Sequence, residues 1–139
     1  CKSLTTTPEL PATKLAEGCY AGMFQVCTSL TTAPSILPAT ILAMECYYYM
    51  FSNCTSLTQA PELPATTLAT ECYNHMFAGC SNLNYIKCLA TDISATKCTN
   101  NWVDRVVNTG TFIKHPNMTS WTTGDSGIPR GWNIENAEL

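Results

Sequence analysis

The sequence has few charged residues and no long apolar run. Only 12% of its 139 residues are charged, roughly half the share usual in globular proteins. The net charge of -3 leaves no basic stripe, so nucleic acid is not an expected partner. Because no apolar run approaches the ~20 residues needed to cross a bilayer, the sequence predicts no membrane-spanning segment.

Residue sets that carry enzyme chemistry are also lacking. The chain has two histidines, His75 and His115, and no phosphate loop or dinucleotide fingerprint. Cys72 and His75 form a Cys-x-x-His pair, but a zinc site needs four converging ligands. The GDSG segment at 124–127 is similar to the nucleophile loop of chymotrypsin-like proteases, yet a triad and an oxyanion hole are missing, which favours a plain turn. We therefore expect no enzyme activity, no metal and no cofactor.

Repetition is what the sequence has in abundance. GCYAGMFQVCTSL begins at residue 18, ECYYYMFSNCTSL at 45 and ECYNHMFAGCSNL at 71, and a degenerate copy, KCTNNWVDRV, begins at 97. The phrases recur every 26 or 27 residues, and a period of this length is typical of stacked units that bury their apolar faces against one another. The four units open at Cys1, Cys27, Cys54 and Cys80.

Within one unit, the apolar spacing predicts a short helix. Cys72, Met76 and Cys80 are spaced i, i+4, i+8, with Tyr73 and Phe77 beside them, which places them on one helical stripe. The prolines that follow each such phrase permit only a short strand, from about 57 to 60 in the third unit. Each unit is thus expected to hold one short strand and one short helix.

The phrases MFQVCTSL, MFSNCTSL and MFAGCSNL, with the proline-bearing loops between them, resemble the BspA-like leucine-rich repeat proteins of bacterial surfaces. The resemblance covers roughly residues 1–103. It implies a leucine-rich-repeat-like, right-handed α/β solenoid with one strand and one helix in each unit of 26 or 27 residues. The sequence departs from the family in repeat length, in the Met before Phe, and in the fourth unit, which has neither residue.

The repeat pattern stops near residue 104. Turn residues accumulate beyond that point, with the short β-prone runs TFIKH, MTSW and GWNIEN between them. The last unit of an open stack must cover an apolar edge and unpaired strand groups. We therefore divide the chain into the repeat region 1–103 and the C-terminal region 104–139, in which 104–135 is expected to form a β cap.

Nine cysteines are present, and their odd number excludes complete intramolecular pairing. Equivalent cysteines in neighbouring units would lie about one strand spacing apart, ~5 Å, a distance that permits a disulfide. The favoured interpretation is two ladders of buried free thiols, with Cys88 buried outside them, because cysteine packs well as a small hydrophobe. The ladders are Cys1, Cys27, Cys54 and Cys80, and Cys19, Cys46, Cys72 and Cys98.

Candidate binding residues are those that differ between units while the apolar stripe is kept. On the helix side, the pair that follows the Cys-Tyr dipeptide varies, which indicates exposure. Tyrosines in such positions offer a large amphipathic contact area at low entropic cost; alternatively, they shield the extra residue of the second unit. The candidates are Tyr48, Tyr49, Asn74 and His75 on the helix side, and Thr32, Gln59 and Tyr85 on the strand side.

Function is therefore expected to lie on the surface. The family resemblance implies a non-catalytic, secreted or cell-surface module that binds a host or bacterial surface protein or a glycan in adhesion, with an export signal upstream of this segment. Two alternatives remain open: a structural spacer that displays another domain, and the non-catalytic part of a larger surface enzyme.

Overall fold

The computed structural model describes residues 2–139; Cys1, expected to open the first unit, lies outside the described residues. The regular secondary structure of this range is three short strands, β1 (Tyr85–Cys88), β2 (Thr111–Lys114) and β3 (Asn133–Asn136). No helix occurs within residues 2–139. The prediction of a leucine-rich-repeat-like α/β solenoid with one helix per unit is therefore wrong.

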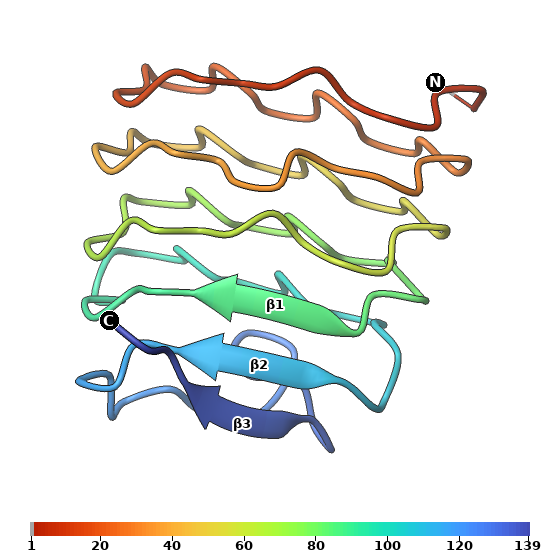
Figure 1. The fold of residues 1–139 in the computed structure, drawn as a ribbon. Helices are drawn as coiled ribbons and strands as arrows, with labels where there is room; N and C mark the ends of the chain where they lie inside the picture. Colours follow the sequence, from red (N-terminus) through yellow and green to blue (C-terminus); the bar gives the residue numbers. More distant parts are fainter. Residues whose placement is uncertain (1) are drawn as a thin grey trace.

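The strands form a parallel sheet in the order β1-β2-β3. Residues 85 and 111 are partners in this sheet, and the same step of 26 residues continues toward the N-terminus as single parallel bridges, Thr6 to Thr32 and Gln59 to Tyr85. Figure 1 shows the chain lying in successive layers, from the N-terminal layer at the top to β3 at the bottom. The strand expected at 57–60 is reduced to the bridge at Gln59, because prolines at 61 and 64 follow it and lack the donor that a ladder needs.

The segments predicted to be helical are runs of consecutive turns, hereafter the turn segments 17–26, 44–53, 70–79 and 96–105. In that order, they belong to the first, second, third and fourth layers. Their backbone hydrogen bonds alternate along the chain. Cys19 and Ala21 donate to the carbonyls three residues earlier, whereas Gly18 and Tyr20 donate across to Met44 and Cys46 of the next layer, at 3.0 Å in both cases. Beyond its first turn, an α-helix would direct all of its N–H groups to carbonyls of the same segment, whereas here half of the donors join the layers.

A left-handed residue occurs at every fourth position of each turn segment. In the first segment these are Gly18, Gly22 and Val26, with φ of 63°, 63° and 59°. The later segments place mostly other residues than glycine there, namely Glu45, Tyr49, Asn53, Glu71, His75, Gly79, Lys97, Asn101 and Arg105. A left-handed residue with a Cβ costs about 1–2 kcal/mol, so interlayer bonding and packing must offset a considerable backbone strain.

This geometry explains why an apolar stripe at i, i+4, i+8 was mistaken for a helix. Two overlapping turns advance the chain by four residues, so residues four apart face the same way, as they nearly do in a helix of 3.6 residues per turn. Cys72, Met76 and Cys80 indeed all point inward, each with 0% exposure. The burial was predicted correctly and the hydrogen-bond pattern was not.

Aromatic side chains pack in columns through the core. Phe24, Phe51 and Phe77 stack with ring centroids 5.5 and 5.8 Å apart. The prediction that Tyr47 is a core residue is confirmed, since 1% of it is exposed. It belongs to a second, longer column whose neighbouring rings are 5.6–6.0 Å apart: Tyr20, Tyr47, Tyr73, Trp102 and Trp121.

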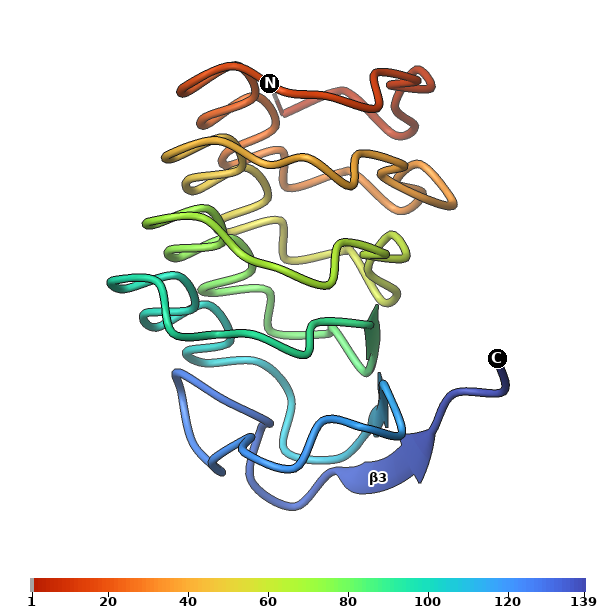
Figure 2. The same cartoon turned by 90° about the vertical axis from the view of Figure 1, so that its left-hand side faces the viewer.

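The C-terminal region extends the sheet. β2 lies in the run TFIKH and β3 in GWNIEN, whereas MTSW contains no strand. Every residue of β3 is exposed, and Figure 2 shows the chain after β3 leading away from the layers. The division at residue 104 stays a prediction.

Candidate functional site

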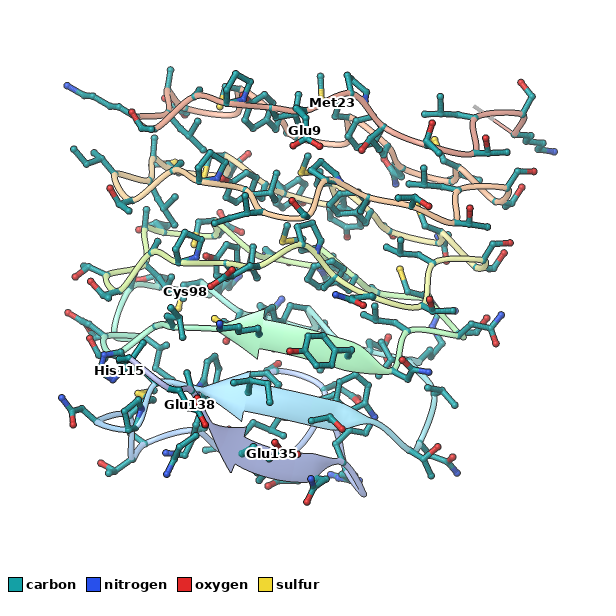
Figure 3. The ribbon with its side chains drawn as sticks, in the orientation of Figure 1. Glu9, Met23, Cys98, His115, Glu135 and Glu138 are labelled. Carbon is teal, nitrogen blue, oxygen red and sulfur yellow. The ribbon has the colours of Figure 1, made fainter. Side chains whose placement is uncertain are left out.

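The cysteines lie mostly inside the stack. All eight cysteines in residues 2–139 are free thiols, and seven of them are buried. Cys19, in the first layer, is exposed, so the prediction that it belongs to a ladder of buried thiols is wrong. Two thiols of one predicted ladder bond to backbone in the layer before them: Sγ of Cys54 donates to the Phe24 carbonyl and Sγ of Cys80 to the Phe51 carbonyl, both at 3.0 Å. Cys98, of the other ladder, lies within the fourth layer (Figure 3).

Burial suppresses the acidity of these thiols. Desolvation raises the pKa of Cys46 to about 11 and the pKa values of Cys54 and Cys88 to about 12. The thiolate is the reactive form of cysteine, so these groups are poor nucleophiles and poor metal ligands at neutral pH. Among residues 2–139, no three His, Cys, Asp or Glu side chains are placed to hold a metal ion.

A thiol-labelling experiment tests this arrangement. In a Cys1→Ser background at pH 8, we expect Cys19 to react with a small disulfide reagent within seconds to minutes. The other seven thiols should react only after unfolding in denaturant, because they are buried. Mass spectrometry after each stage counts the labels. Rapid labelling of several thiols in the folded protein, or disulfides between layers, would contradict the structure.

The GDSG loop is hydrogen-bonded to the turn segment 96–105. The side chain Oγ of Ser126 accepts from the backbone N–H of Asn101 at 2.9 Å, and its carbonyl accepts from Oγ1 of Thr99 at 2.8 Å. The Asp125 carbonyl accepts from the N–H of Val103 at 3.1 Å. In the earlier turn segments, the N–H groups at these positions donate to carbonyls of the following layer. In turn segment 96–105, oxygen atoms of the GDSG loop accept these hydrogen bonds instead. This supports the interpretation of GDSG as a turn.

The strand-side candidates come together. Thr32 and Gln59, both exposed, line a groove of about 300 Å³, with Pro34 and Ala60 also in its wall. Gln59 bridges to Tyr85 in the next layer, so the three candidates follow one another across three layers. The groove walls are mainly threonine, alanine and proline, and no charged side chain lines it.

The helix-side candidates separate into an outward set and one buried residue. Tyr48, Tyr49 and His75 are half-buried on the outer side of the turn segments, whereas Asn74 is only 4% exposed. Nδ2 of Asn74 donates to Oε1 of Glu71 at 2.9 Å, and its Oδ1 is hydrogen-bonded to Nδ1 of His75. The expectation that Asn74 faces solvent is therefore wrong; it holds the neighbouring His75 and Glu71 in place.

Tyr48, Tyr49 and His75 form an aromatic cluster that spans two layers. The rings of Tyr49 and His75 are stacked, with centroids 4.5 Å apart and planes 2° from parallel. The ring of Tyr48 also lies 4.5 Å from Tyr49, tilted by 59°. Such pairs are worth about 0.5–1.5 kcal/mol beyond the burial of their area. We call these three residues the aromatic cluster.

An open hollow adjoins the aromatic cluster. It measures about 440 Å³ and is lined by Ala21, Gly22, Gln25, Tyr48 and Tyr49. It therefore lies between Ala21, Gly22 and Gln25 of the first layer and the tyrosines of the second. Most of the wall is apolar or aromatic, and the Gln25 amide and two phenol hydroxyls supply polar groups, a combination typical of ligand sites.

The electrostatics of the aromatic cluster are acidic. The pKa of Tyr48 is raised, first by desolvation and then by neighbouring groups that include Tyr49, Glu71 and Glu45. The acidic groups disfavour a tyrosinate and, by the same interaction, favour a cation close to the ring. At neutral pH the Tyr48 phenol is therefore a hydrogen-bonding group.

The left-handed positions of the turn segments were missed by sequence reasoning. They form rows of outward side chains, such as Glu45, Tyr49 and Asn53 in the second layer. A signal for them was present, because glycine or asparagine recurs at the same fourth positions, as at Gly22, Gly79 and Asn101, and these residues tolerate positive φ.

Searches for similar proteins found no match for this chain among protein-family models, curated proteins or solved structures. No helix within residues 2–139 has the length and hydropathy that a membrane crossing requires.

Proposed function

We propose that this chain is a non-catalytic binding module that contacts a protein or glycan partner through the aromatic cluster and the hollow beside it. The observation that carries the proposal is the outward stack of Tyr49 on His75, with Tyr48 and an open hollow next to it. Exposed aromatic rings around a concavity are enriched where proteins bind partners.

The backbone adds a second argument. Tyr49 and His75 have φ of 56° and 54°, in a region that costs each of them about 1–2 kcal/mol relative to glycine. The equivalent residue of the first layer is Gly22, which shows that the backbone accepts glycine at this position. A tyrosine and a histidine in place of that glycine add two rings to the outer side at a backbone cost, which favours a role for these side chains.

The resemblance to BspA-like surface proteins favours a secreted or cell-surface module in adhesion, and we include that location in the proposal. The hollow and the aromatic cluster are the part of the proposal that mutation can test directly. A spacer would make no specific use of these side chains.

The test compares the protein with a Tyr48→Asn/Tyr49→Asn variant on a glycan array and on a panel of purified extracellular matrix proteins. This variant recreates the pair that the fourth layer already has, Asn100 and Asn101, so the fold should be retained. We expect specific binding by the wild type and at least a tenfold loss in the variant, since aromatic contacts of this kind carry about 2 kcal/mol or more at hot spots. An Ile41→Ser variant, changed at a residue that is 57% exposed, is the matched control. Equal binding by all three proteins, or no binding to any probe, would refute the proposal.

A further inference from the structure

The outward stack of rings ends abruptly at the first layer. Backbone hydrogen bonds place Gly22 over the Tyr48–Tyr49 pair and Tyr49 over the Asn74–His75 pair, with Gly22 N–H donating to the Tyr48 carbonyl at 2.7 Å and Tyr49 N–H to the Asn74 carbonyl at 3.0 Å. The ring of His75 thus lies under Tyr49. On the other side, where Gly22 has no side chain, the hollow lies next to Tyr49.

The hollow lies where a ring of the first layer would stack on Tyr49. Layers joined by backbone hydrogen bonds are about 4.8 Å apart, close to the 4.5 Å between the rings of Tyr49 and His75. The face of Tyr49 that points away from His75, hereafter its free face, borders the hollow, so one flat group fits against it. The tilted ring of Tyr48 borders the same space, and we call this part of the hollow the slot.

The edge of this slot presents a hydrogen-bond acceptor. A Cβ added to Gly22 would lie 3.3 Å from Oε1 of Gln25, so the Gln25 amide oxygen reaches over the place where the missing side chain would begin. Glu45 belongs to the same row as Tyr49, four residues before it, and Glu71 lies in the next layer. These oxygens favour a ligand that carries several N–H donors.

The charges on this face favour a cation. Glu45 and Glu71 both act on Tyr48, and the five residues that line the hollow are uncharged. The basic residues of the left-handed rows, Lys97 and Arg105, are in the fourth layer, three layer steps or roughly 14 Å away. At physiological salt such charges are largely screened over that distance, so Lys97 and Arg105 contribute little to the potential at the slot.

We propose that the slot binds the guanidinium group of an arginine on a partner protein, stacked on the free face of Tyr49. The inference rests on the proposed function and specifies its ligand. A guanidinium is planar, permanently cationic and carries five N–H donors, so it alone among protein side chains matches the flat slot, the acceptor of Gln25 and the carboxylates together. Arginine also gains a cation–π attraction on a tyrosine face.

The first experiment titrates the 139-residue protein with the capped peptide Gly-Arg-Gly and follows tyrosine ring and backbone amide signals by NMR. We expect saturable shifts at Gly22, Gln25 and Tyr49, with affinity in the millimolar range because one exposed stacked ion is a weak ligand. Peptides with citrulline or lysine in place of arginine are the controls for charge and for planarity, and both should bind several-fold more weakly.

Two variants in the first turn segment provide a matched pair. Gly22→Tyr should complete the stack and fill the slot, and the backbone already holds a tyrosine at φ 56° at the equivalent Tyr49. We expect it to abolish arginine binding. Val26→Tyr, at an exposed position with φ 59° outside the slot, should leave binding unchanged. Glu45→Gln should weaken arginine binding about two- to fivefold, the usual effect of one exposed ion pair.

The outcomes separate the inference from the function on which it rests. Arginine binding that Gly22→Tyr abolishes and Val26→Tyr retains supports both. Binding of a methyl hexoside with shifts at Tyr48 and Tyr49, without arginine binding, overturns the arginine inference and leaves the proposed function standing. Equal affinity for arginine and citrulline peptides also overturns it, because the charge would then be irrelevant. Absence of any shift with all of these probes overturns the inference, and with a negative array result it refutes both.

Discussion

Trp102→Ala is expected to lower the free energy of unfolding by about 3–5 kcal/mol, the range for truncation of a fully buried large aromatic side chain. Trp102 is 0% exposed and stacks on Tyr73 and Trp121 at 5.7 and 5.6 Å. Its Nε1 also donates to the Gly127 carbonyl at 2.8 Å. The substitution therefore opens a cavity, interrupts the longer aromatic column and leaves a buried carbonyl without its donor.

Urea unfolding followed by circular dichroism measures the effect. Trp102→Phe should cost less than alanine, about 1–3 kcal/mol, because it retains a ring but removes the Nε1 donor. Ile134→Ala, in β3 at a residue that is 47% exposed, is the control and should cost about 1 kcal/mol or less. A Trp102→Ala effect as small as that of the control would show that the C-terminal region does not pack on the fourth layer as described.

Gly127→Ala is expected to cost about 3 kcal/mol, at the upper end of the range for forced overpacking. A Cβ at residue 127 would lie 2.1 Å from the carbonyl oxygen of Thr122 and 2.8 Å from its carbonyl carbon. Both are backbone atoms, so no side-chain rotation relieves the clash. The loop would have to give up the bond from Ile128 N–H to the Thr122 carbonyl, 2.9 Å long, and with it the position of the Gly127 carbonyl that receives Trp102.

The matched control is Gly18→Ala. Gly18 has φ of 63° and nothing within 4 Å of an added Cβ, so alanine there should cost only the conformational penalty of about 1–2 kcal/mol. Thermal unfolding of both variants, followed by the fluorescence of Trp102, Trp121 and Trp132 together, distinguishes the two causes. If the two substitutions have the same cost, the close contact with Thr122 is not maintained in solution.

The periodic pattern allowed the buried residues to be predicted, but it did not allow the local backbone conformation to be predicted. Cys72, Met76 and Cys80 are inward as expected, yet an apolar residue at every fourth position fits both a helix of 3.6 residues per turn and paired turns that repeat every four. The two differ in where the N–H groups donate. Half of them donate to another layer, a non-local bond that single-sequence periodicity does not report.

The placement of the candidate residues was predictable only in part. Variation between units drew attention to Tyr48, Tyr49 and His75, which lie half-buried on the outer side of the turn segments. The same argument misplaced Asn74, because a small amide can be buried when it is hydrogen-bonded, here to Glu71 and His75. The stacking of Tyr49 on His75 depends on the register between layers, which only the structure supplies.

The nearly constant sequence distance between the bonded layers of residues 5–105 has a kinetic consequence. Backbone contacts between these layers join residues 24 to 28 apart, as in Glu45 to Thr70, Gly18 to Met44 and Lys14 to Ile41, whereas β2 and β3 pair residues 22 apart. Adding each layer therefore closes a loop of nearly the same length, at an entropic cost of about 3 kcal/mol plus a constant, however many layers already exist. Contact order relative to chain length falls as layers are added, so the entropic cost of closing each further loop does not rise with the number of layers. Such a chain can lengthen by duplication of a unit without becoming a harder folding problem.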